Sequence, residues 1–144
     1  MPLEQQVTSL ELSKRLKELG VKQESYFSWV LIETKAYDNV GVHSTEWIKE
    51  KELEKYITAS AFTVAELGEM LPWRSKRMGT VNNAELMCTK LVNTATSKRL
   101  WCVAYWDEDK PPYIGFVVDF KNETEAEARG LMLCYLLENK SITV

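Results

Sequence analysis

The stretch "NETEAEARGLMLCYLLENK", residues 122–140, predicts the helix on which the rest of the fold depends. Thr124 is a favourable N-cap residue, and Glu127 follows three residues later, as in a capping box. The glutamates of the first turn lie at the positive end of the helix dipole, where negative charge is stabilising. Residues 131–137 are apolar on nearly every side, so we expect this helix to form the centre of the core.

Three segments that precede this helix predict strands, because they are rich in β-branched and aromatic residues. They are residues 84–93, which are also compatible with a short helix, 99–107 and 113–120. Their short connectors favour antiparallel neighbours. Consecutive elements tend to pack together, so we expect four strand residues to contact the C-terminal helix, namely Trp101, Val103, Phe116 and Val118.

Near the N-terminus, a short and well-bounded helix is predicted. Thr8 or Ser9 caps it, and it runs to Leu19 with leucines on one face. Gly20 stands where a left-handed C-terminal cap belongs. The pattern therefore marks both ends of this helix.

Between this helix and residue 62 the pattern is less regular. Residues 25–34 predict a strand with both faces partly covered. Residues 36–44 predict a turn or loop that contains His43, interpreted as an exposed loop histidine. Residues 45–62 predict a charged helix.

The segment "AFTVAELGEMLP", residues 61–72, resembles the opening helix of a DNA-binding helix-turn-helix. Thr63 predicts its N-cap, with Glu66 at the capping-box position, and Pro72 predicts its end. Only six residues separate Pro72 from Gly79, which is too short for a recognition helix that crosses the major groove. We therefore expect a short core helix and no sequence-specific binding to duplex DNA.

A small basic segment follows, and it is the one candidate binding site in the sequence. It comprises Trp73, Arg74, Lys76 and Arg77. Basic residues beside an aromatic ring can hold phosphates and stack on a base. The net charge of −3 argues against a dedicated nucleic-acid binder. A solvated loop anchored by one tryptophan is the main interpretation, and nucleic-acid binding is the alternative.

The composition excludes several kinds of chemistry. Three scattered cysteines, Cys88, Cys102 and Cys134, and a single histidine do not form a zinc-binding pattern. Neither a phosphate-binding loop nor a short-range triad spacing is present. We therefore expect no bound metal, no cofactor and no catalytic residues, and we interpret the cysteines as buried thiols in a reducing compartment.

The elements together predict a single domain, residues 1–144, of the α+β class. We expect an antiparallel sheet of three to four strands with helices packed mainly on one face. Hydrophobic residues make up 45% and charged residues 27%, as in ordinary globular domains. The N-terminus does not resemble a signal peptide, and the longest apolar run, residues 131–137, is too short to span a bilayer. We expect a soluble, cytoplasmic protein.

Three stretches are similar to small uncharacterised proteins encoded in bacteriophages and prophages. They are residues 10–25, 61–72 and 124–140, "LELSKRLKELGVKQES", "AFTVAELGEMLP" and "TEAEARGLMLCYLLENK". The resemblance extends along nearly the whole chain. It implies a bacterial or phage-infected cytoplasm, and it implies no activity and no functional residue.

The sequence therefore favours a non-enzymatic, phage-type accessory or binding protein. One alternative is a nucleic-acid-associated protein that uses Trp73–Arg77, and another is an enzyme whose site is assembled from distant residues. A protein partner and a homodimer both stay open, because residues 131–137 and the strands at 99–107 and 113–120 carry large apolar side chains on more than one face.

Overall fold

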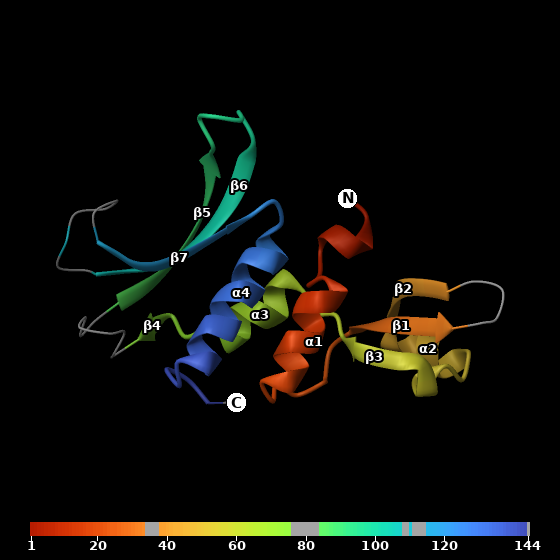
Figure 1. Cartoon of the computed structure of the whole chain (residues 1–144). Helices are drawn as coiled ribbons and strands as arrows, with labels where there is room; N and C mark the ends of the chain where they lie inside the picture. The colour runs from red at the N-terminus through yellow and green to blue at the C-terminus, as the bar shows by residue number, and fades with distance from the viewer. Residues whose placement is uncertain (34–37, 76–83, 108–109, 111–114, 144) are drawn as a thin grey trace.

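The structure is a computed structural model that describes residues 1–33, 38–75, 84–107, 110 and 115–143. These residues form two antiparallel sheets with helices between them. The first sheet has the strand order β2-β1-β3 and the second has the order β4-β5-β6-β7. Helices α1, α3 and α4 lie between the two sheets (Figure 1). The α+β class is confirmed, and the first sheet is an addition to the one that was predicted.

The second sheet contains the predicted strands. They are β5 (Ala84–Val92), β6 (Arg99–Asp107) and β7 (Phe116–Asn122), with a two-residue edge strand, β4 (Arg74–Ser75). β6 pairs with β5 and β7 in antiparallel register, as the short connectors predicted. Residues 84–92 form a strand and not a helix, because the ladder to β6 satisfies their backbone groups.

The first sheet corrects two predictions. The predicted loop at 36–44 is strand β2 (Asp38–Ser44) in its described part, and it pairs with β1 (Phe27–Glu33) along its whole length. Pairing with a neighbour outweighs the turn-like composition of this segment.

The predicted helix at 45–62 is also wrong beyond its first turns. α2 (Thr45–Glu50) ends early, a 3₁₀ turn η2 follows (Glu54–Tyr56), and β3 (Ile57–Ser60) completes the first sheet. The β-branched pair at 57 and 58 and the hydrogen-bonded ladder to β1 explain this strand.

Helix α1 (Leu10–Glu18), which follows a 3₁₀ turn η1 (Leu3–Gln5), has the predicted ends. The Ser9 hydroxyl accepts a hydrogen bond from the Leu12 N–H, so Ser9 is the N-cap. Gly20 has φ 88°, which confirms the left-handed cap. The Val21 N–H donates to the Leu16 carbonyl and the Gly20 N–H to Lys17, the two bonds of a Schellman motif.

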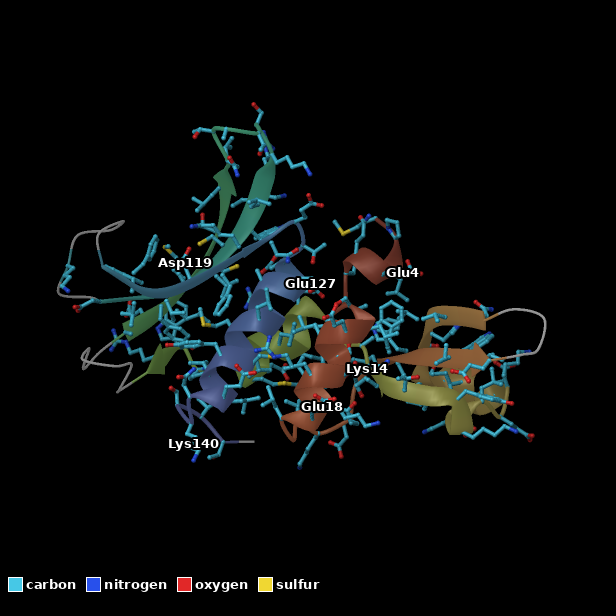
Figure 2. All side chains as sticks on the ribbon, in the orientation of Figure 1. Glu4, Lys14, Glu18, Asp119, Glu127 and Lys140 are labelled. Atoms are coloured by element: carbon cyan, nitrogen blue, oxygen red, sulfur yellow. The ribbon has the colours of Figure 1, made fainter. Side chains whose placement is uncertain are left out.

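Helix α4 (Glu125–Glu138) lies at the centre of the molecule. Thr124 caps it by accepting from the Glu127 N–H, as predicted. The Glu127 carboxylate does not complete the capping box. It accepts from the Ser9 N–H at 2.5 Å instead, so one carboxylate joins the N-terminal ends of α4 and α1 (Figure 2).

The core around α4 agrees with the predicted neighbours except at one position. Leu133 and Leu136 are fully buried, and the flank of α4 is covered by α1 and α3. Trp101, Val103 and Val118 pack in this cluster, whereas Phe116 does not. A bulge in β7 places Phe116 opposite Trp106, on the other face of the sheet, and Phe120 takes its place beside the Tyr135 ring.

Helix α3 (Val64–Met70) contains the predicted capping box, since Thr63 and Glu66 exchange side-chain and backbone hydrogen bonds. It ends before Pro72 as expected. No helix among the described residues is long and apolar enough to cross a membrane.

Candidate functional site

The basic segment predicted from the sequence is described only in part. Trp73 is 67% exposed, as a contact residue would be. Arg74 lies in β4, and its guanidinium donates to Glu85 of β5 at 2.6 and 3.1 Å, so its charge is already paired. Lys76 and Arg77 lie outside the described residues. Residues 74–75 are a strand, so a second helix does not begin directly after Trp73.

His43 does not lie in an exposed loop, so that prediction is wrong. It belongs to β2, it is half-buried, and its ring stacks on Trp47 of α2 with centroids 4.1 Å apart. The absent side chain of Gly41 leaves room for the imidazole, because a Cβ there would lie 3.0 Å from Nε2. The histidine therefore helps to fix α2 on the sheet.

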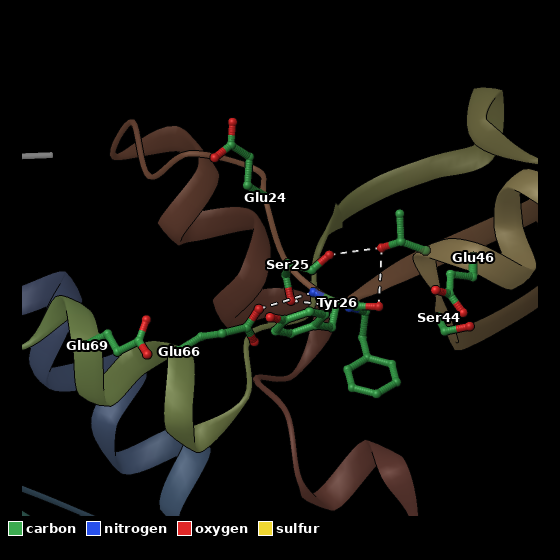
Figure 3. Close-up of a pocket in the computed structure, with 9 residues that line it drawn as sticks. Glu24, Ser25, Tyr26, Ser44, Glu46, Glu66 and Glu69 are labelled. Atoms are coloured by element: carbon green, nitrogen blue, oxygen red, sulfur yellow. Dashed lines mark hydrogen bonds between the residues drawn. The ribbon is translucent and has the colours of Figure 1, made fainter.

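A concave site that the sequence did not reveal lies where α3 meets the first sheet. We call it the Tyr26 cleft. Its volume is about 710 Å³, and three separate segments line it, namely Glu24, Ser25, Tyr26, Phe27, Ser44, Thr45, Glu46, Glu66 and Glu69. Figure 3 shows Glu66 and Glu69 on one side, Ser44 and Glu46 on the other, and Tyr26 between them.

The backbone of Tyr26 is held firmly although its side chain is 75% exposed. Its N–H donates to Glu66 Oε1 at 3.1 Å. Its carbonyl accepts from the Thr45 N–H at 2.9 Å and from the Thr45 hydroxyl at 3.2 Å. Since Glu66 also caps α3 through Thr63, the tyrosine is fixed to both α3 and α2. A partner that binds here therefore meets a backbone that is already ordered.

The charges of the cleft are all of one sign. Glu24, Glu46 and Glu69 are exposed, and none forms an ion pair with a described residue. Glu66 is occupied by its hydrogen bonds to the backbone at Thr63 and Tyr26. No lysine or arginine is among the lining residues. The cleft therefore combines an exposed aromatic ring with a negative rim.

A second polar group lies inside the molecule, between α4 and β5. Arg129 donates to Glu125 at 2.7 and 2.8 Å, and the Cys88 thiol contacts the same carboxylate at 3.4 Å. Burial raises the pKa of Cys88 to about 11, so the thiol is neutral at physiological pH. This cluster is a satisfied structural contact.

The cysteines form no disulfide, and their surroundings favour the neutral thiol. All three cysteines are free, and burial also raises the pKa of Cys102 and that of Cys134. In residues 1–33, 38–75, 84–107, 110 and 115–143, no group of three histidine, cysteine, aspartate or glutamate side chains could hold a metal ion.

Sequence reasoning missed the Tyr26 cleft because its residues are distant in the chain. Glu66 was recognised only as a capping residue, and Tyr26 only as one position of a strand. The capping box is the one sequence signal that points to this site. It places Glu66 in the first turn of α3, where its carboxylate can also bond to a neighbouring segment.

No family model, curated protein or solved structure matches this chain.

Proposed function

We propose that the protein is a non-enzymatic binding protein and that it contacts a positively charged segment of a partner protein at the Tyr26 cleft. The observation that carries the proposal is the 75% exposed Tyr26, held by its backbone inside a concave, acidic surface. Tyrosine is enriched among residues that dominate binding energy at interfaces, because its large ring orders at low entropic cost. A phage-type accessory role, which the sequence favours, is compatible with such binding.

The chemistry of the cleft favours a basic partner. Lysine or arginine side chains gain from the three exposed carboxylates, and a cation can also lie over the Tyr26 ring. An acidic partner would meet like charges with no basic lining residue to offset them.

Fluorescence anisotropy tests this proposal with three labelled peptides of equal length, each containing one leucine. One peptide is rich in lysine, one is uncharged and one is rich in glutamate. We expect only the lysine-rich peptide to bind and its affinity to fall with added salt. Tyr26→Ala and Glu69→Gln should each weaken binding several-fold.

Glu18→Gln serves as the matched control, because Glu18 is an exposed glutamate on α1 outside the cleft. Equal affinity for all three peptides, or an equal loss of affinity in Glu18→Gln and Glu69→Gln, would exclude the cleft as the specific site.

Nucleic-acid binding through Trp73–Arg77 is the second candidate, and the 67% exposure of Trp73 favours it. Anisotropy with labelled single strands and duplexes at physiological salt separates the two functions. We expect no sequence-dependent binding to duplexes. Binding of single strands that is weakened by Trp73→Ala and unaffected by Tyr26→Ala would favour this second function.

A further inference from the structure

The face of the second sheet that points away from α4 is largely apolar. Alternation along β6 directs Trp101, Val103 and Tyr105 into the core around α4. The residues between them, and their cross-strand partners, point the other way. We call this surface the outer face; its apolar members are Met87, Leu91, Leu100, Cys102, Ala104, Trp106 and Phe116.

No described element packs on the outer face. The main helical contacts of this sheet come from α4 on β6 and β7, and α4 lies with α1 and α3 on the core side (Figure 1). None of the outer-face residues belongs to the core cluster around α4. Cys102 and Ala104 at the centre are inaccessible. Their longer neighbours on the three strands remain partly exposed.

The bulge in β7 enlarges this apolar surface. It brings Phe116 opposite Trp106, so two aromatic residues occupy facing positions on the outer face. Tryptophan, phenylalanine and methionine are enriched in the central part of protein interfaces. In a sheet with one solvated face, the residues on that face are normally polar. The apolar residues at these positions therefore favour a covered face.

The charged residues of the outer face occur as pairs of opposite sign. Asp119 (labelled in Figure 2) and Lys121 pair with Ala104 and Cys102 across the ladder, which places both on this face. Lys121 Nζ lies 2.6 Å from Asp119 Oδ2, and both side chains stay partly exposed. Arg74 and Glu85 form a second pair at the β4 edge. The outer face therefore has no net charge, and the same face of a second copy can match its charges.

We propose that the outer face binds a second copy of this chain across a two-fold axis. Such an isologous contact sets the same apolar patch on both sides and brings Lys121 of one copy towards Asp119 of the other. A strongly acidic or basic partner would gain no such match. This inference is independent of the Tyr26 cleft, because no residue of the second sheet lines that cleft.

The size of the face sets the expected affinity. Strands of nine residues are about 30 Å long, and three neighbouring strands span about 14 Å. The projected area is therefore about 400 Å², below the roughly 800 Å² per partner of a standard stable interface. We expect a reversible dimer that dissociates on dilution through the micromolar range.

Sedimentation equilibrium across a dilution series measures this association. We expect Leu100→Lys to weaken the dimer more than tenfold, because it places a charge in the apolar contact. Val40→Lys is the control, since Val40 is a 45% exposed apolar residue on the other sheet, and it should have no effect. A monomer at every concentration, or a dimer unaffected by Leu100→Lys, would overturn the proposal.

Charge reversal tests the two-fold geometry and does not depend on the folding of Leu100→Lys. Asp119→Lys and Lys121→Asp each replace the Asp119–Lys121 pair by two charges of the same sign, so each should weaken the dimer several-fold. The double variant restores opposite charges and should restore the dimer. A double variant as weak as the single variants would contradict the pairing of Asp119 with Lys121 across the axis.

Discussion

At the scale of single residues, Thr8 connects parts of the molecule that are far apart in the sequence. Its hydroxyl lies 2.7 Å from Ser13 Oγ and accepts from the Phe62 N–H at 3.1 Å. Its carbonyl accepts from Trp29 Nε1 at 2.9 Å. One buried threonine thus joins α1, the first sheet and the segment that enters α3. The sequence presented it only as a possible cap.

Two helical glycines give a matched prediction at this scale. A Cβ at Gly130 would lie 2.6 Å from Leu12 Cδ2 and 3.1 Å from Thr8 Cγ2, because α1 crosses α4 there. Gly130→Ala should therefore lower the free energy of unfolding by about 1–3 kcal/mol, as overpacking does. At Gly68 the nearest atom is the guanidinium tip of Arg129, at 3.3 Å.

The nearest nitrogen of Arg129 is Nη1, whereas Nε and Nη2 bond to Glu125, so a small shift of Nη1 relieves the contact. Gly68→Ala should therefore be neutral or stabilising by up to about 1 kcal/mol, the gain in helix propensity. Urea unfolding of both variants measures the difference. Equal stability of the two variants would show that the close crossing of α1 and α4 at Gly130 does not constrain the fold.

At the scale of elements, α4 contacts more of the molecule than any other helix. It packs on β6 and β7 and is covered by α1 and α3. Its two ends are also joined to α1, through Glu127 and Ser9 at one end and through Glu138 and Arg15 at the other. The apolar character of α4 on several sides follows from these neighbours and does not require a second copy of the chain.

The leucines of α4 give the prediction at this scale. Leu133 and Leu136 are fully buried, so truncation of either to alanine should cost about 2–5 kcal/mol of unfolding free energy. Glu138→Gln removes only an exposed ion pair with Arg15 and should cost less than about 1 kcal/mol. Chemical denaturation measures all three.

Glu125 is unsuitable as the neutral control on this helix, because it is only 18% exposed and bonded to Arg129. Near-neutral results at both leucines would mean that α4 is peripheral to the folded state.

At the scale of the whole molecule, stability should fall in alkaline solution. Burial raises the pKa of Cys88 and of Cys134 from 9.0 to about 11 and raises that of Tyr105 as well. The folded state therefore holds protons that the unfolded state releases. The stabilisation is complete below pH 9 and is lost as the pH rises through 11.

Thermal unfolding between pH 8 and pH 12 should show a melting temperature that declines from about pH 9. A thiol reagent at pH 8 should label the native protein slowly and reach three thiols per chain only in denaturant. A melting temperature that is constant across this range, or rapid labelling of the native protein, would show that the thiols are exposed.

The sequence by itself determined the elements whose signals are local. Caps at Ser9, Thr63 and Thr124 and the left-handed Gly20 marked helix ends, because capping depends on a few adjacent residues. Alternation and short connectors likewise specified the β5-β6-β7 meander, and the apolar run at 131–137 identified the central helix.

Only the tertiary structure decided the features that depend on distant partners. β2 and β3 form because β1 supplies the hydrogen bonds of their ladders. A bulge in β7 places Phe116 on the face of the sheet opposite the core. The Glu127 carboxylate accepts from the Ser9 N–H in place of the local capping bond that the sequence predicted. The Tyr26 cleft combines residues 24–27, residues 44–46, Glu66 and Glu69, which meet only after α3 packs beside the first sheet. Side-chain contacts over such separations leave no periodic pattern in the sequence, so the cleft can be recognised only in the folded structure.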